Sequence, residues 1–235
     1  MTGARHRVGL LVPAGDSVME PDLWRGLPRP LTLHVTRMYL ESATVSGERK
    51  MLDDELDPAA CRIAQVGPEL VIFGCTSAAA ILGLEGEADI VRRVEKMAGC
   101  HCLTVMGAAI EEISQHSPER LLLVTPYIDE INDRLQATFR AAGFPVCGIA
   151  GMGLASEAAI GAVKPRDIRR FVVDAARRAG VVPDCVFVSC TTFRALEAAQ
   201  AIQRDLAIPV VTSNQSVLKG IVRRFAPSGR IQEGC

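Results

Sequence analysis

The chain repeats part of its own sequence, and this repeat restricts the folds open to it more than any other feature. An apolar run that ends in Cys75-Thr-Ser lies over a second that ends in Cys190-Thr-Thr, an offset of 190 − 75 = 115 residues. Leu11-Val-Pro13 lies over Val124-Thr-Pro126, at 126 − 13 = 113 residues. Two matches at nearly one offset predict two related halves that share a cleft. Since the chain has 235 residues, each half can bury a core.

Short apolar runs alternate along the chain with longer segments of helical period. Runs of this length, bounded by proline and glycine, are typical of parallel strands buried on both faces. Alternating strands and helices predict an α/β, doubly wound fold. The predicted strands are Val8–Val12, Leu31–Thr36, Leu70–Phe73, His101–Val105, Leu121–Thr125, Val146–Ile149, Cys185–Ser189 and Pro209–Thr212.

Four apolar stripes at helical spacing lie in the second half, and we interpret them as core-facing helix surfaces. We place the lobes at 1–118 and 119–235, with the C-terminal helix able to pack back on the first lobe. The stripes are Ile131, Leu135 and Phe139, with Asp129 as a candidate N-cap; Ile168, Phe171 and Ala175; Leu196, Ala199, Ile202 and Leu206; and Val217, Ile221 and Phe225.

Composition excludes several partner classes. A net charge of −1 provides no electrostatic footprint for nucleic acid or an anionic membrane, and 4% aromatic residues are too few for base stacking. No apolar run approaches the roughly 20 residues that cross a bilayer. We therefore expect a cytoplasmic protein whose eight cysteines are free thiols. Cys100-His101-Cys102 lacks further ligands for a metal site, so we expect none.

Cys75 and Cys190 each follow an apolar strand and precede a helical segment. In open α/β sheets ligands bind at this edge, where free backbone N–H groups lower a thiol pKa and hold a carboxylate. Cysteines in strands are more often core residues, which is our interpretation of Cys61, Cys147 and Cys185. For the repeated pair we instead expect two thiols on opposite faces of one bound carbon, which suits an isomerase.

The sequence resembles the aspartate/glutamate racemase superfamily, in its maleate cis-trans isomerase and arylmalonate decarboxylase branch. The resemblance runs from Val8-Gly-Leu-Leu-Val-Pro13 to Val211-Thr-Ser-Asn-Gln215, and the paired Cys-Thr motifs are its specific part. It implies two Rossmann-like lobes with four-stranded parallel sheets, a small carboxylic-acid substrate, no metal or organic cofactor, and a homo-oligomer. Decarboxylases of this branch keep only the second cysteine, so the pair favours an isomerase or racemase.

The resemblance also implies roles for individual residues. Cys75 would add to the alkene carbon of maleate to give a succinyl-cysteine intermediate, and Cys190 would act on the other side as acid and then base. Tyr127 would hydrogen-bond a substrate carboxylate. Asp16 and Glu157 replace two asparagines of the maleate isomerase pattern, so they would favour an amine-bearing or monocarboxylate substrate, unless they are loop or capping residues. The backbone amides that would hold carboxylates lie around Thr76, Ser77, Thr191 and Thr192.

Three alternatives remain open at this point. The protein could be an amino-acid racemase, an arylmalonate-type decarboxylase, or a two-lobed small-acid binding protein whose cysteines are not catalytic. The binding protein would keep its ligand affinity without both thiols, whereas the enzyme would lose turnover when either is removed.

Overall fold

The computed structural model describes residues 6–226, and its first half contains a four-stranded parallel sheet. The strands are β1 (His6–Pro13), β2 (Leu31–Met38), β3 (Leu70–Phe73) and β4 (His101–Thr104), in the spatial order β2-β1-β3-β4. All of β3 is buried, because helices cover both faces of the sheet.

The second half repeats this arrangement. Its strands are β5 (Leu121–Thr125), β6 (Val146–Gly151), β7 (Cys185–Val188) and β8 (Val210–Thr212), in the order β6-β5-β7-β8, and each adjacent pair is parallel. The two orders are the same when the strands of each half are counted in chain order. The predicted strands and the predicted α/β fold with two similar lobes are therefore confirmed, with strand ends shifted by at most two residues.

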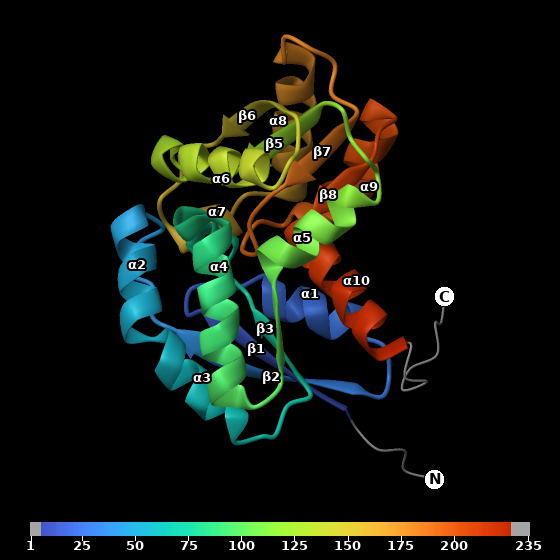
Figure 1. The fold of residues 1–235 in the computed structure, drawn as a ribbon. Helices are drawn as coiled ribbons and strands as arrows, with labels where there is room; N and C mark the ends of the chain where they lie inside the picture. The colour runs from blue at the N-terminus through green and yellow to red at the C-terminus, as the bar shows by residue number, and fades with distance from the viewer. Residues whose placement is uncertain (1–5, 227–235) are drawn as a thin grey trace.

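Helices connect the strands in both lobes (Figure 1). The four predicted stripes lie on α6, α8, α9 and α10, although Phe171, Leu196 and Leu206 are only half-buried. Asp129 is the first residue of α6 and not its cap, since the N-cap is Ile128 and makes no side-chain hydrogen bond. The helices are α1 (Met19–Gly26), α2 (Val45–Asp54), α3 (Leu56–Ala64), α4 (Thr76–Ala98), α5 (Val105–Ser114), α6 (Asp129–Ala141), α7 (Glu157–Gly161), α8 (Pro165–Arg178), α9 (Ala195–Leu206) and α10 (Ser213–Phe225).

Two helices join the lobes. In Figure 1, α5 and α10 lie side by side between the two sheets. The buried stripe of α10 packs in one cluster with Val8 and Leu10 of β1, so the last helix covers the first sheet. A Cβ on Gly220 would meet the Leu103 side chain at 2.8 Å, so a glycine lets α10 approach β4. The proposed boundary between residues 118 and 119 is thus crossed by packed helices and stays a prediction.

Within residues 6–226, no helix combines the length and apolar character that a bilayer crossing requires.

Candidate active site

Cys75 lies where β3 ends and α4 begins. Its side chain is only 3% exposed, and helical structure starts at the next residue. Gly74 precedes it and donates its N–H to the Leu11 carbonyl at 2.7 Å. A Cβ on Gly74 would lie 2.8 Å from that same oxygen, so only glycine lets β3 reach this edge beside β1. The predicted position at a strand end and a helix start is confirmed for this thiol.

Cys190 lies at the equivalent edge of the second sheet, but its surroundings differ. It is 6% exposed and has a φ of 101°, a conformation that residues other than glycine rarely adopt. Its N–H donates to Ser213 Oγ at 3.0 Å. The next helix, α9, begins only at Ala195, after a turn. The prediction that this thiol directly precedes a helix is therefore wrong, because residues 191–194 form a turn before α9 begins.

The two sheet edges meet each other. Thr191 Oγ1 donates to the Gly74 carbonyl at 3.4 Å, and Thr76 Oγ1 lies 3.3 Å from Ser213 Oγ. Burial raises the pKa of the Tyr127 hydroxyl well above its ordinary value, and the nearby Cys190 and Cys75 raise it further. Both cysteines thus lie at one buried site between the lobes.

Two predicted acids lie beside Cys190. Asp16 is 1% exposed, and its Oδ1 accepts the N–H groups of Val18 at 2.8 Å and Met19 at 2.9 Å. Asp16 therefore caps the start of α1, as the alternative interpretation held. Its other oxygen, Oδ2, is buried without a hydrogen-bond partner, and its charge raises the pKa of the Cys190 thiol. One oxygen of Asp16 thus binds the backbone before α1, and the other remains without a hydrogen bond near the Cys190 thiol.

Glu157 packs from α7 against the loop that follows β1. Its Oε1 accepts the Thr192 hydroxyl at 3.0 Å, while Oε2 is buried without a hydrogen bond beside the Gly15 backbone. Burial, followed by the charge of Asp16, raises the pKa of Glu157 to about 7. The Gly15 amide lowers the pKa of Glu157, but this effect is smaller than that of burial. At neutral pH this acid is therefore near the midpoint of its titration.

The sequence analysis missed a third acid, Glu48. It extends from α2 and is 1% exposed, and its Oε2 lies 3.3 Å from Cys75 Sγ. Its Oε1 accepts a hydrogen bond from the Ser77 hydroxyl. A signal was present, because Glu48 shares the buried side of α2 with Met51 and Leu52, where a carboxylate is unexpected.

Neither thiol is acidified. Burial raises the pKa of Cys75 and of Cys190 well above the ordinary cysteine value, and neighbouring carboxylates add to this effect. Backbone N–H groups of Ala78 and Thr192 favour the thiolates, as expected from the sequence, but the loss of hydration outweighs them. The expectation of lowered thiol pKa values is therefore wrong, and both cysteines rest as neutral thiols.

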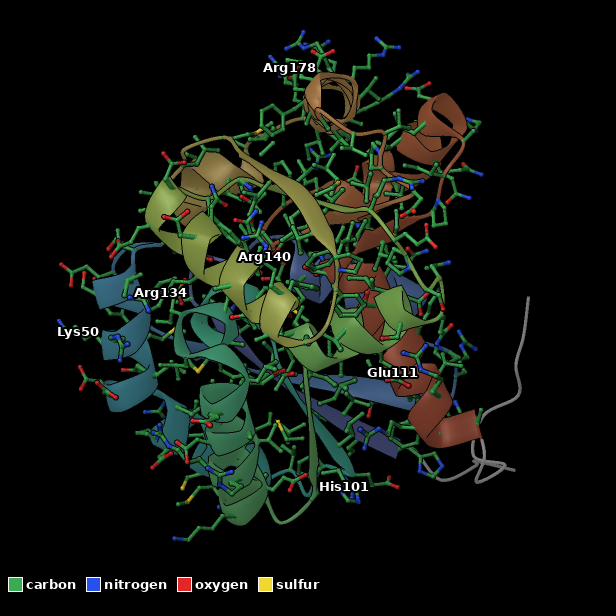
Figure 2. The ribbon with its side chains drawn as sticks, turned by 45° about the horizontal axis from the view of Figure 1, so that its top comes forward. Lys50, His101, Glu111, Arg134, Arg140 and Arg178 are labelled. Atoms are coloured by element: carbon green, nitrogen blue, oxygen red, sulfur yellow. The ribbon has the colours of Figure 1, made fainter. Side chains whose placement is uncertain are left out.

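The carboxylates of the site make no ion pair within residues 6–226, and Arg37 reaches only the backbone carbonyl of Asp16, at 2.8 Å. No ion pair joins a lysine, arginine or histidine to Asp16, Glu48 or Glu157 there. The basic residues Lys50 on α2 and Arg134 on α6 lie exposed on the outer surface (Figure 2). In the same range no group of three or more histidine, cysteine or acidic side chains is arranged to hold a metal ion.

The structure thus brings together all of the predicted site residues, although the four hydroxyls are engaged with the protein itself. Ser77 binds Glu48, Thr192 binds Glu157, and Thr76 and Thr191 link the lobes. The role of their backbone amides in holding a carboxylate stays a prediction. The residues concerned are Asp16, Cys75, Thr76, Ser77, Tyr127, Glu157, Cys190, Thr191 and Thr192.

Known proteins resemble this chain over nearly its whole length. The family model described as arylmalonate decarboxylase matches residues 8–234. A maleate isomerase from Nocardia farcinica is 25% identical and covers 93% of this chain and 89% of its own length. An arylmalonate decarboxylase from Bordetella bronchiseptica is 24% identical, with 97% and 93% covered. A structure of the Nocardia farcinica maleate cis-trans isomerase, a cysteine-to-serine mutant with a covalently bound succinylcysteine intermediate, superposes with a TM-score of 0.82 at 21% identity, with 94% and 92% covered.

Proposed function

Because the chain belongs to the arylmalonate decarboxylase family, we propose that it is a cofactor-independent isomerase or racemase acting at a carbon next to a carboxylate. The observation that carries this proposal is the pair of buried cysteines, Cys75 and Cys190, at equivalent edges of two like sheets. Tyr127 interacts with both thiols, which supports a single substrate position between them. The similarity to maleate isomerases supports the isomerase reading.

The proposed reaction on maleate uses both thiols in turn. Cys75 adds as a thiolate to one alkene carbon, forming a C–S bond, and the alkene electron pair moves to the neighbouring carbon beside its carboxylate. Cys190 gives its proton to that carbon, and the resulting single bond rotates. Cys190 then removes the proton, the double bond re-forms as the C–S bond breaks, and fumarate leaves. No atom is gained or lost, so the step requires no further reactant.

The charge of the site bears on the substrate. Asp16 and Glu48 are buried, Glu157 is half-buried, and within residues 6–226 no ion pair joins these acids to a cation. A dianionic acid therefore binds at a cost unless Glu48 and Glu157 take up protons. The unpaired oxygens Asp16 Oδ2 and Glu157 Oε2 would suit an ammonium group. This observation favours amino-acid racemisation as the second candidate: one thiolate removes the α-proton while the other thiol donates a proton from the opposite face.

A substrate screen tests the proposal. Wild-type protein is incubated in deuterium oxide with maleate, with single enantiomers of amino acids, and with arylmalonates, and the products are followed by NMR. We expect a cis-trans isomer or deuterium at the α-carbon with change of configuration. Carbon dioxide release from arylmalonates alone would assign a decarboxylase instead. Binding without turnover of any acid in the screen would assign a binding protein.

Location and assembly belong to the same proposal. We propose a cytoplasmic homo-oligomer, which rests on the cysteine usage and the family resemblance.

A further inference from the structure

Glu48 and Cys75 form a buried acid–thiol pair that the two-cysteine scheme does not use. Sγ of Cys75 lies 3.3 Å from Glu48 Oε2 and 3.4 Å from Ser77 Oγ, and the Ser77 hydroxyl donates to Glu48 Oε1. These three side chains close a triangle of hydrogen bonds between α2 and the start of α4. Each of them is at most 5% exposed. Water therefore has little access to the proton that Sγ carries.

The electrostatics of this pair favour one shared proton. Burial raises the pKa of Glu48 to about 7 and raises that of Cys75 much further. The carboxylate of Glu157 also raises the pKa of the Cys75 thiol. If both lost their protons, two negative charges would lie in contact in a buried site. Above neutral pH the pair therefore holds one negative charge, which either the carboxylate or the thiolate can carry.

We propose that Glu48 is the general base of the reaction, accepting the proton of Cys75 when the thiol becomes the reactive thiolate and returning it afterwards. The S–H bond breaks with its electron pair left on sulfur, and an O–H bond forms on Oε2. The net charge of the pair does not change, so no new charge is buried. This step rests on the proposed function, in which Cys75 reacts as a thiolate.

Within residues 6–226, no hydrogen bond joins the thiol of Cys190 to a carboxylate. The influences on Cys190 are its burial, a hydrogen bond with Tyr127, the charges of Asp16 and Glu157, and the Thr192 amide. Among these, no carboxylate accepts its hydrogen bond. The two cysteines are thus chemically unequal despite the pseudo-symmetry of the lobes. This assigns base-assisted attack to Cys75 and leaves Cys190 as the proton donor.

The pH dependence of Cys75 alkylation tests this inference without turnover. Iodoacetamide labelling is measured from pH 6 to pH 9 by peptide mass spectrometry, in wild type and in Glu48→Gln. The wild-type pair loses its one proton around pH 7, and above that pH a fixed share of the pairs carries the charge on sulfur, so the thiolate fraction levels off. From pH 7 to pH 9 we expect the wild-type rate to rise only about twofold, whereas the variant rises roughly 100-fold. The other groups facing the site, Asp16, Tyr127, Glu157 and Cys190, are the same in both proteins.

Glu87→Gln is the matched control, because Glu87 is another buried glutamate on α4 and accepts a hydrogen bond from Thr104 at the end of β4. Its alkylation profile should match that of wild type. A constant change at every pH in Glu48→Gln would mean a structural role only and would overturn the proposal. So would a wild-type rate that keeps rising tenfold per pH unit, even if the variant does not fold.

A second measurement covers the case in which the reagent does not reach Cys75. In protein labelled with ¹³C at cysteine Cβ, the wild-type Cys75 signal should move with a midpoint near pH 7, and the signal in Glu48→Gln should not. A wild-type signal that is unchanged around pH 7 would refute the shared proton. For the substrate found in the screen, Glu48→Gln should lose about 10²–10⁴-fold in turnover just above neutral pH, where the wild-type Glu48 is mostly ionised. If no acid is turned over, the proposed function fails while the alkylation profile still tests the pair.

Discussion

Replacing Glu157 by glutamine should stabilise the protein, and the gain should depend on pH. Glu157 Oε1 accepts the Thr192 hydroxyl, which the amide oxygen of glutamine can also do. Its Oε2 is buried without a partner, near the charge of Asp16. An amide at this position removes a buried charge and adds two donors. The substitution therefore isolates the cost of keeping this carboxylate in the site.

The magnitude follows from the pKa of the group. Burial and Asp16 raise the pKa of Glu157 from 4.5 to about 7. A folded-state pKa above the unfolded value means that the folded protein binds the proton more tightly. The contribution of protonated Glu157 to the free energy of unfolding is therefore fully present below pH 4.5. It is lost as the pH rises to about 7, a loss of about 3 kcal/mol. Glutamine has no proton to lose, so the difference in stability should appear across this pH window.

Urea unfolding of both proteins at pH 4.5 and at pH 8 measures the difference. We expect the free energy of unfolding of Glu157→Gln, relative to wild type, to be about 3 kcal/mol larger at pH 8 than at pH 4.5. Glu48 titrates in the same range in both proteins and cancels from the comparison. If the two proteins differed in stability equally at both pH values, or if the variant were less stable at pH 8, the carboxylate of Glu157 would not lower stability as we infer.

Two further outcomes follow from the same site. Cys61 lies exposed on helix α3, so our interpretation of it as a core strand residue is wrong. At neutral pH iodoacetamide should label Cys61 before Cys75 or Cys190, because burial both shields the site thiols and raises their pKa values; faster labelling of either site thiol would contradict this. The double variant Asp16→Asn/Glu157→Gln should bind maleate more tightly, by roughly tenfold for each 1.4 kcal/mol of repulsion removed; unchanged affinity measured by calorimetry would mean that these acids do not face the substrate.

The sequence was sufficient to predict the strands and the two lobes, because each buried parallel strand is a continuous apolar run. The repeat placed Cys75 and Cys190 at equivalent edges, and the matching orders β2-β1-β3-β4 and β6-β5-β7-β8 confirm that arrangement. We expected that the C-terminal helix could pack back on the first lobe, and α10 does pack on the first sheet, with Gly220 allowing its close approach to β4.

The chemistry of the site was harder to predict. The thiol pKa values depend on desolvation, which requires knowing how completely both lobes cover Cys75 and Cys190. The residues of the turn after Cys190 are also compatible with a helix, so the sequence did not show whether a turn or a helix follows this thiol. Glu48 lies 27 residues before Cys75 in the chain and contacts it only through the packing of α2 on α4.

Turnover by single-cysteine variants tests the central claim most directly. For the acid accepted in the screen, Cys75→Ala and Cys190→Ala should each lose at least about 100-fold in turnover while still binding it, because each removes one face of the reaction. Cys102→Ala and Cys185→Ala, which change buried strand cysteines of the two lobes, should keep near wild-type turnover. Near wild-type turnover by either site variant would contradict the two-cysteine mechanism. Loss in Cys190→Ala alone, together with carbon dioxide release by the wild type, would instead identify a decarboxylase.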